Sequence, residues 1–363
     1  MTLTANRDLD RYVDQELRQR KVMAAKRIYK GALVGLSVDG YAKPFEPGDV
    51  FAGVAYEEQD NTSGASGDKS VRVFVQSDFE MTLTGVSESD AGKAVFATDD
   101  DAVALIGHFD GYVGRVVHKS GTDLAVVRLD VGGKPSDRDH GGREVVFDFA
   151  KPFTATGATA GNLVTTDGAR LVSALGLGVT HVEDANGAAD LEFDAVAEIA
   201  QASIEVAEVF AVNKGVKLEA RLHSPAIGDD AALDMSWGLI AGITANSRAS
   251  IVHADATDFA GFHMNGNSAN IMARSDDATT DTGEIDSTVD NVTTPGSYKE
   301  FVVIVRPAGT VELWIDGTRI LSSTSFAVNT ASVLGAIVNL EKTSNDTVGK
   351  LRVDRLRVTG AGN

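Results

Sequence analysis

The chain lacks cysteine, long apolar runs and leucine-rich heptads, and each absence narrows its possible structure. Without cysteine among the 363 residues, neither disulfides nor thiolate metal sites can form, so stability must come from packing or assembly. No apolar run approaches the roughly 18 residues of a membrane span. Polar and charged residues fill the N-terminal region where the apolar core of a signal peptide would lie. Valine, alanine and the 37 glycines are frequent instead, and this composition favours an all-β protein.

Charge is unevenly distributed along the chain. The formal net charge is −19, which argues against a general nucleic-acid binder, because neutralising phosphates requires clustered lysine and arginine. The first 30 residues carry eight basic and four acidic side chains, a net charge of +4, which leaves −23 for the rest. A basic arm on an acidic body indicates two surfaces with different partners, although an ordinary charged helix is the alternative. The basic residues expected to bind a partner are Arg7, Arg11, Arg18, Arg20, Lys21, Lys26 and Arg27.

The N-terminal arm, residues 1–30, has the pattern of an amphipathic helix. Apolar residues from Leu9 to Met23 recur at mixed spacings of three and four, with charges between them. Glu16 lies four residues before Arg20, a favourable spacing for an ion pair on a helix. Because the apolar stripe is thin, we expect the helix to need a partner surface to keep its shape.

Residues 31–153 alternate short β runs with turns and predict a small β-rich domain. Residues 32–38 form a partly alternating apolar run, and Asp39-Gly40 after them is a strong turn signal. Residues 59–68 are rich in asparagine, serine, glycine and aspartate, so we expect a mobile loop. Residues 71–75 then alternate with a period of two, as a half-buried strand does.

This part of the chain contains the strings IYKGALV, GVAYE and VRVF, and later GYVGRV and AVVRLD. In this order, and with a loop rich in glycine, serine and aspartate before VRVF, they resemble the head-decoration (capsid cement) proteins of tailed bacteriophages. The resemblance covers roughly the first 130 residues. It implies a small, β-tulip-like domain that binds the major capsid protein and assembles as a homotrimer.

The C-terminal half has the clearest strand pattern. Residues 154–167 are rich in threonine, alanine and glycine and predict a linker, which leaves residues 168–363 as a second domain. Residues 216–222 alternate apolar and charged side chains. The string FVVIVRPAGTVELWIDGTRI and the terminal LRVDRLRV resemble concanavalin A-like jelly rolls of the lectin and laminin-G type. That resemblance implies a β-sandwich, a fold that serves lectins, hydrolases and structural modules alike.

No set of residues points to catalysis. Retaining hydrolases on this sandwich place two glutamates and an aspartate on one strand, and no such spacing occurs here, so we expect no enzyme. The histidines form neither an H-x-x-x-H nor an H-E-x-x-H pair, so we expect no catalytic zinc and no cofactor. Trp237 and Trp314 are either sugar-stacking platforms or core residues, and their apolar surroundings favour the core.

An acidic stretch near residue 280 is the one candidate for a metal site. Its oxygen-bearing side chains are of the kind that Ca²⁺ prefers, although no EF-hand spacing occurs among them. The alternative is a solvated acidic loop that protects a sheet edge from pairing. The Ca²⁺ candidates are Asp276, Asp277, Asp281, Glu284 and Asp286.

Together these patterns predict an all-β structural virion protein with a helical arm, a capsid-binding domain and a jelly roll. We expect it to be made in the bacterial cytoplasm and to act on the outer surface of the capsid. Its expected partners are the major capsid protein and further copies of itself, with surface glycans as a further candidate and with no nucleic acid and no membrane. The alternative is a virion adhesin in which the jelly roll binds glycans and the first domain anchors it.

Overall fold

The structure is a computed structural model that divides the chain into two compact units. Unit 1 is Met1–Arg143 with Thr359–Asn363, and unit 2 is Glu144–Val358. The chain is nearly all β, with 61% of residues in strands and 3% helical. Among the described residues, no helix is long and apolar enough to cross a membrane. The described residues are 5–6, 17–133, 142–147, 154–155, 161–164, 169–174, 178–182, 188–193, 195–196, 198–228, 233–242, 256–266, 268–290, 297–346 and 348–361.

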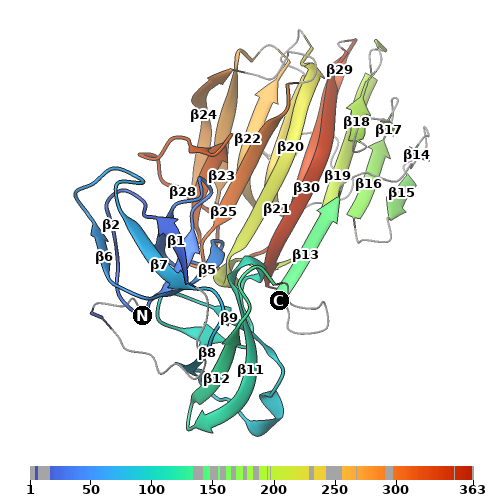
Figure 1. Cartoon of the computed structure of the whole chain (residues 1–363). Helices are drawn as coiled ribbons and strands as arrows, with labels where there is room; N and C mark the ends of the chain where they lie inside the picture. The colour runs from blue at the N-terminus through green and yellow to red at the C-terminus, as the bar shows by residue number, and fades with distance from the viewer. Residues whose placement is uncertain are drawn as a thin grey trace. The chain divides into compact units, whose positions relative to one another are not determined.

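Unit 1 is built from two five-stranded sheets and one small strand pair (Figure 1). Its elements are β1 Leu17–Lys21, β2 Lys26–Ile28, β3 Leu33–Leu36, β4 Ala42–Pro44, β5 Val50–Ala55, β6 Gln59–Asn61, β7 Ser70–Phe74, β8 Asp78–Thr82, η1 Glu88–Asp90, β9 Ala94–Ala97, β10 Val103–Ala104, η2 Phe109–Gly111, β11 Tyr112–Gly121 and β12 Leu124–Leu129. The first sheet has the order β1-β7-β5-β3-β4 and the second β10-β9-β11-β12-β8, while β2 pairs with β6. All described pairings within these sheets are antiparallel.

The strings noted in the sequence become neighbouring strands. IYKGALV, GVAYE and VRVF supply β3, β5 and β7, which lie side by side in the first sheet, and GYVGRV and AVVRLD supply the paired β11 and β12. Gly53 in GVAYE has a φ of 133°, and a Cβ there would lie 2.2 Å from the carbonyl oxygen of Phe74 on β7. Only glycine lets β5 approach β7 this closely.

The apolar faces of the two sheets in unit 1 enclose one core. Leu33, Val54 and Phe74 from the first sheet pack with Val95 and Val127 from the second, and all are buried. The opposite face of the first sheet packs on a second cluster, which the N-terminal residues Val22 and Ile28 complete. Burial on both faces accounts for the apolar runs in these strands.

The predicted N-terminal helix is wrong where the structure describes it. Residues 17–21 form β1, which pairs along its whole length with β7, and residues 26–28 form β2. Residues 7–16 lie outside the described residues. The apolar residues that suggest a helix here include Val22. In the structure Val22 and Ile28 are both fully buried and belong to the cluster that packs on the first sheet. Helix propensity is a weak preference, and this tertiary burial overrides it.

The segment expected as a mobile loop at residues 59–68 is instead fixed to the N-terminal strands. The side-chain Nδ2 of Asn61, which is buried, donates to the backbone oxygens of Met23 and Ala65 at 3.0 and 2.9 Å and of Val22 at 3.3 Å. The hydroxyl of Ser66 accepts from the backbone N–H of Ala24. One amide side chain thus replaces the backbone pairing that the turn lacks.

We expect Asn61→Ala to destabilise unit 1 by about 1–3 kcal/mol, because three backbone carbonyls lose their donor and the one of Val22 is buried. Hydrogen exchange at the amides of β1 and β7 is the direct measurement, and it should accelerate. The matched control is Thr62→Ala on the exposed side of the same turn, which should change stability by less than about 0.5 kcal/mol. Equal exchange in the two variants would contradict the role given to Asn61.

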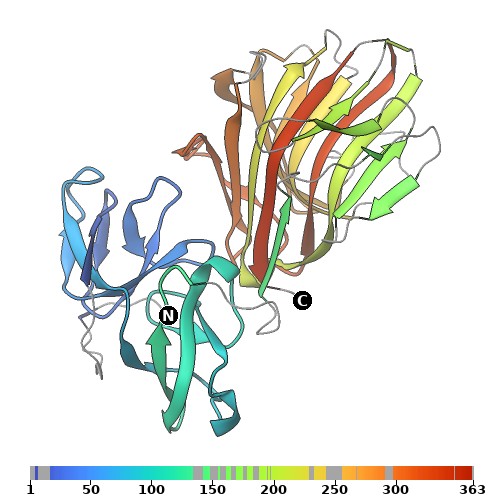
Figure 2. The same ribbon diagram turned by 45° about the vertical axis from the view of Figure 1, so that its right-hand side comes forward.

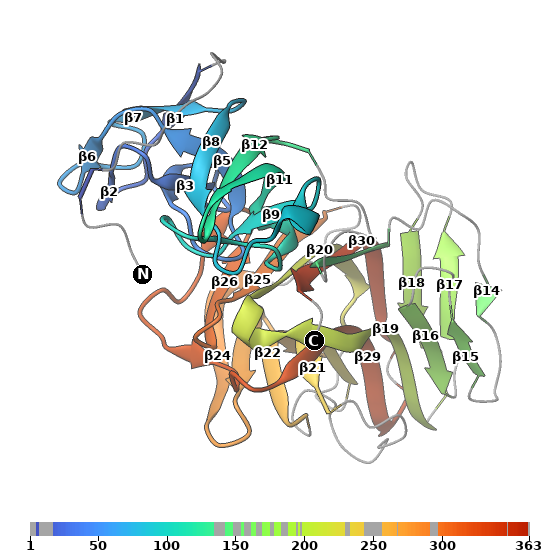
Figure 3. The same ribbon diagram turned by 90° about the horizontal axis from the view of Figure 1, so that it is seen from below.

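Unit 2 is a β-sandwich, as predicted (Figure 2). Its elements are β13 Gly142–Phe147, β14 Thr154–Ala155, β15 Gly161–Val164, β16 Ala169–Ala174, β17 Gly178–Val182, β18 Ala188–Glu192, β19 Glu198–Ala211, η3 Val212–Lys214, β20 Val216–Ala226, β21 Leu233–Ala241, β22 Asp258–Asn265, β23 Asn270–Asp276, β24 Asp281–Asp290, β25 Lys299–Val305, β26 Thr310–Ile315, β27 Thr318–Arg319, β28 Phe326–Ala327, β29 Val333–Asn345 and β30 Lys350–Ala361. One sheet has the order β15-β16-β19-β29-β21-β22-β23-β24 (Figure 3). The other has the order β14-β17-β18-β30-β20-β25-β26-β27, with β13 beside β30 and β28 beside β26.

The boundary between the units differs from the expected linker at residues 154–167. The chain divides between Arg143 and Glu144, and β14 and β15, which fall within the expected linker, belong to the two sheets of unit 2. Strand β13, which we expected at the end of the first domain, pairs with β30 of the sandwich. A composition rich in threonine, alanine and glycine suits a linker, but threonine also suits an edge strand.

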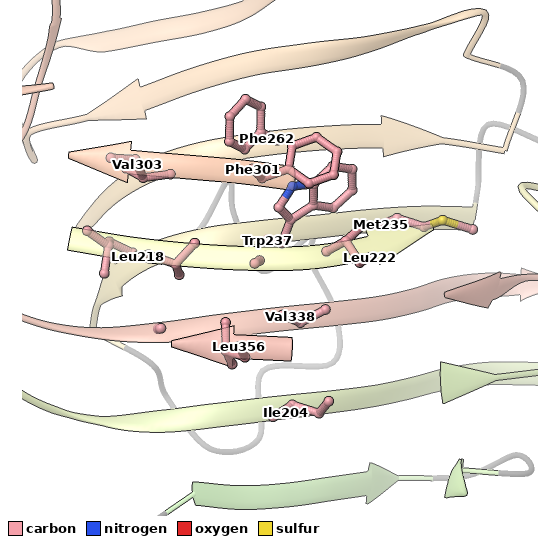
Figure 4. Close-up of a cluster of buried hydrophobic side chains, with 14 of the residues drawn as sticks. Ile204, Leu218, Leu222, Met235, Trp237, Phe262, Phe301, Val303, Val338 and Leu356 are labelled. Carbon is pink, nitrogen blue, oxygen red and sulfur yellow. The ribbon is translucent and has the colours of Figure 1, made fainter. Parts of the chain in front are cut away.

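A single large core lies between the two sheets of the sandwich (Figure 4). Trp237 of β21 is fully buried there, 6.0 Å from the ring of Phe262 and 4.9 Å from that of Phe301. Along β21 the core residues alternate with Asp234 and Ser236, which therefore point to the opposite face of the eight-stranded sheet.

The outer face of the ten-stranded sheet carries a ladder of ion pairs. Arg352 of β30 donates to both carboxylate oxygens of Asp190 on β18, at 2.6 and 2.8 Å. Burial alone would lower the pKa of Lys350, but hydrogen bonds to Asp190 and Glu192 raise it above its usual value. These pairs join β18 to β30 across the sheet, so the charges on this face have a structural use.

Candidate functional site on the second face of the eight-stranded sheet

The basic residues predicted to form a capsid-binding arm are divided between two strands. Arg18, Arg20 and Lys21 lie on β1, and Lys26 and Arg27 lie on β2 in a different sheet. Arg7 and Arg11 lie outside the described residues. A hydrogen bond from the Nε of Arg27 to Glu58, at 2.8 Å, raises the pKa of the arginine. The positive charge is therefore divided between β1 and β2, and part of it is paired with an acidic side chain of the same chain.

The five acidic Ca²⁺ candidates lie on the hairpin of β23 and β24 and its turn. Asp277 accepts from the backbone N–H groups of Thr279 and Thr280 at 2.9 and 2.6 Å, and these bonds lower the pKa of its carboxyl. A backbone N–H and the amide of Asn270 lower the pKa of Asp286 in the same way. These two carboxylates thus have turn and cross-strand partners.

The remaining acids of this hairpin also have protein partners. Asp281 accepts from Arg274 at 2.8 Å, and an oxygen of Glu284 lies 3.6 Å from Nδ1 of His263 on β22. In the part of the chain that the structure describes, no group of three or more histidine, aspartate or glutamate side chains is placed to hold a metal ion. The acidic hairpin is an edge of the eight-stranded sheet, where charge discourages pairing with another chain.

The most unusual feature of the sandwich is a block of polar side chains on the second face of the eight-stranded sheet. Four neighbouring strands, β19, β29, β21 and β22, each contribute two residues to two parallel rows. We call this block the polar grid. Its rows are Ser203-Asn339-Ser236-His263 and Gln201-Glu341-Asp234-Asn265, each written in the order of paired residues across the sheet.

The polar grid is buried and only partly satisfied by the protein. Ser236 and Asn339 are fully buried. A hydrogen bond joins His263 to Asp234, and the amide of Gln201 donates to the side-chain oxygen of Asn339 at 3.0 Å. Among the described residues, the hydroxyl of Ser236 and the Nδ2 of Asn339 find no hydrogen-bond partner. Because unpaired buried polar groups are costly, two of them side by side indicate a site that receives a ligand or water.

Glycines and half-buried residues shape the surroundings of the grid. Gly238 and Gly261 are paired beside it, and a Cβ at either would lie within 2.8 Å of the other's Cα. Neither glycine has a side chain of its own, and the ring of Phe259 lies 3.0 Å from the place that a Cβ of Gly261 would take. At the borders, Gln201 and Asn265 are half-buried and the side chain of Glu284 is 41% exposed, so the grid reaches solvent at its edges.

Sequence reasoning missed the polar grid because its members come from four strands that are far apart in the chain. Our search for paired carboxylates followed single strands, whereas Asp234 and Glu341 are neighbours only across the sheet. A signal did exist in residues 233–239, where Asp234 and Ser236 alternate with large apolar side chains. That alternation indicates a polar second face but does not reveal which strands lie beside it.

The unpaired hydroxyl of Ser236 leads to a prediction about stability. We expect Ser236→Ala to stabilise the sandwich by about 1 kcal/mol, because it removes a buried polar group that lacks a partner. The control is Ser203→Ala in the same row, which removes the 2.9 Å hydrogen bond from its hydroxyl to Glu205 and should destabilise by about 1 kcal/mol. Urea unfolding measures the free energy of unfolding of both variants. If both substitutions changed it in the same direction, the distinction between the unpaired hydroxyl of Ser236 and the paired one of Ser203 would be wrong.

Comparisons with known proteins bear on the fold. No family model matches this chain, and no curated protein does. The sandwich is similar to a protein of unknown function from Shewanella oneidensis, at 13% identity over 61% of this chain and 87% of that one, with a TM-score of 0.43. It is similar to an endo-1,3-beta-glucanase from Streptomyces sioyaensis, at 12% identity over 64% and 99%, with a TM-score of 0.42. An alginate lyase from Pseudomonas aeruginosa matches at 10% identity over 50% and 84%, with a TM-score of 0.34.

These matches overturn the prediction that the chain is not an enzyme. The glucanase and the lyase are enzymes, and both are similar in structure to this chain. Our prediction depended on finding no set of carboxylates along one strand.

Proposed function

We propose that the chain is a structural protein of a tailed-phage virion. In this proposal unit 1 binds the major capsid protein on the outer surface of the head, and unit 2 is a second module carried by it. The chain assembles as a homotrimer, as the resemblance to decoration proteins implies, and a ring of three identical subunits is closed and symmetric. Synthesis in the bacterial cytoplasm belongs to the same proposal.

The observation that supports this proposal is the arrangement of the decoration-protein strings in unit 1. They form β3, β5 and β7 side by side in one sheet and β11 paired with β12 in the other, so they specify one structural unit. Gly53, which belongs to GVAYE, is required by the close approach of β5 to β7. The resemblance therefore falls on residues that build the unit and not on scattered surface positions.

Binding to heads of the parent phage tests this proposal. Purified full-length chain should occupy the heads at defined lattice positions, and native mass measurement of the released protein should give a trimer. A chain with Arg18→Gln and Lys21→Gln should bind more weakly, and the binding of the unmodified chain should weaken with salt, because both residues are exposed cations on β1. Full occupancy by the substituted chain at all salt concentrations would remove the proposed role of these residues.

A second function, glycan binding by unit 2, is favoured by the polar grid. Eight polar side chains in two rows offer both donors and acceptors, and Ser236 and Asn339 each have a side-chain atom without a hydrogen-bond partner in the part of the chain that the structure describes. Sugars present many hydroxyl groups at close spacing, and each hydroxyl both donates and accepts. A few fixed polar groups on a rigid sheet are the usual means of orienting such a ligand.

A glycan array probed with the full-length chain tests this second function. We expect binding that the Ser236→Ala variant weakens, although the same substitution raises stability. The opposite directions of these two effects distinguish a ligand contact from a general loss of structure. An array without any bound glycan would leave unit 2 without a glycan-binding role.

A further inference from the structure

We propose that residues 359–361 are a strap, by which the end of the last sandwich strand is held in unit 1. The strap makes the end of β30 a structural part of unit 1, although the rest of the strand belongs to unit 2. This inference goes beyond the proposed virion role, because it concerns the fold of the free chain. Its consequence is a conformational link, since a partner that stabilises unit 1 also stabilises the end of a strand whose other residues build unit 2.

Strand β30, Lys350–Ala361, is divided between the two units. Unit 2 is Glu144–Val358, and the residues from Thr359 onward belong to unit 1. Before this division the inward-facing residues of β30, up to Val358, are buried in the main core of the sandwich. Among the described residues of β30, none after Val358 belongs to that core. One continuous strand therefore serves two separate structural units.

The strap is buried although it lies outside the sandwich core. The exposed fractions of Thr359 and Ala361 are 1% and 0%, and Gly360 between them is also buried. The hydroxyl of Thr359 lies 3.4 Å from a carboxylate oxygen of Asp110, which belongs to η2 of unit 1. Burial outside the sandwich core, together with a contact to a residue 249 positions earlier, indicates that the strap packs in unit 1.

The other passage of the chain between the units also lies in a strand. Strand β13 spans the division between Arg143 and Glu144, and it pairs with β30. The Nε of Arg357 on β30 donates to Glu144 at 2.6 Å, which joins the two strands just before the strap begins. The chain thus enters and leaves unit 2 on paired strands and not through a flexible linker, so the sandwich fixes the start of the strap.

The strap links local unfolding in the two units. Residues that fold as part of one cooperative unit exchange their amide hydrogens when that unit opens. We therefore expect residues 359–361 to open with unit 1, while residues 350–358 stay with the sandwich core. A partner that binds only the folded form of unit 1 stabilises everything that is folded with it, by mass action. In the proposed virion role, attachment to the head would protect the end of β30 in this way.

A charge placed in the strap of the full-length chain tests this inference. Thr359→Asp puts a carboxylate beside that of Asp110 at a buried position, whereas Thr359→Asn has nearly the same shape without the charge. At pH 7 the aspartate variant should exchange the amide hydrogens of residues 108–113 about tenfold faster than the asparagine variant, a change typical of a destabilising substitution in a packed unit. Adding Asp110→Asn should remove most of this difference. Tryptophan fluorescence should show an unchanged unfolding midpoint for unit 2 in all of these chains.

Val358→Ala is the matched control, one residue earlier in the same strand. It should lower the unfolding midpoint of unit 2 and leave exchange at residues 108–113 unchanged, because Val358 belongs to the sandwich core. Equal exchange in the aspartate and asparagine variants overturns the inference, as does a difference that persists when Asp110 is neutral. A lower unit 2 midpoint with Thr359→Asp, without faster exchange in unit 1, overturns it too. These measurements use the free chain, so they decide the inference separately from head binding.

Discussion

Replacing Trp237 with alanine should destabilise the sandwich by about 3–5 kcal/mol, the range for losing a large aromatic side chain from a core. Trp237 is fully buried between Phe262 and Phe301, so the space it leaves cannot be filled without moving both rings. For a unit of this size the unfolding temperature should fall on the order of 10 °C. Both tryptophans of the chain lie in unit 2, so urea unfolding followed by tryptophan fluorescence reports on the sandwich.

Trp314→Ala provides the matched control within the same unit. Trp314 is buried but lies outside the main core cluster, and its Nε1 donates to Glu312 at 3.3 Å. We expect it to cost less than half as much as Trp237→Ala. If the two substitutions were equally costly, the main core would not depend on Trp237 in the way that its packing indicates.

Deleting residues 1–30 should unfold unit 1 and leave unit 2 folded. The deletion removes β1, which pairs with β7, and β2, which pairs with β6. It also removes Val22 and Ile28, whose full burial contributes about 1.5–3 kcal/mol each. That loss is comparable to the whole stability of a small domain, about 5–15 kcal/mol. Hydrogen exchange of unit 1 amides measures the loss, and tryptophan fluorescence follows unit 2 in the same sample.

The control is the chain with Arg18→Gln and Lys21→Gln, which keeps β1 but removes two of its exposed charges. Unit 1 should remain folded in this control. Normal protection of β7 in the deleted chain would show that β1 and β2 are not needed for the sheet.

Much of the fold could be predicted from local patterns. Alternation in residues 216–222 and in LRVDRLRV places β20 and β30, and Asp316-Gly317 marks the turn between β26 and β27. These patterns are informative because one face of each strand is buried and the other is not. The all-β class follows from the same residues.

The misplaced N-terminal helix shows where local patterns fail. Residues 8–28 satisfy the spacing of a helix, and the described residues from Leu17 onward are nevertheless strands. Short segments with thin apolar stripes have weak preferences of their own, so the available partner decides. Here the free side of β7 and a nearby apolar cluster supply that partner.

The polar grid is the feature that only the tertiary structure could decide. The sequence by itself determined that the chain is built from alternating strands without cysteine, and it placed Trp237 in a core. It could not place Ser236 beside Asn339, or Asp234 beside Glu341, because these pairs depend on which strands become neighbours. Strand order depends on contacts between residues that are far apart in the chain, and no local pattern specifies those contacts. The candidate site therefore exists only once the eight-stranded sheet has assembled.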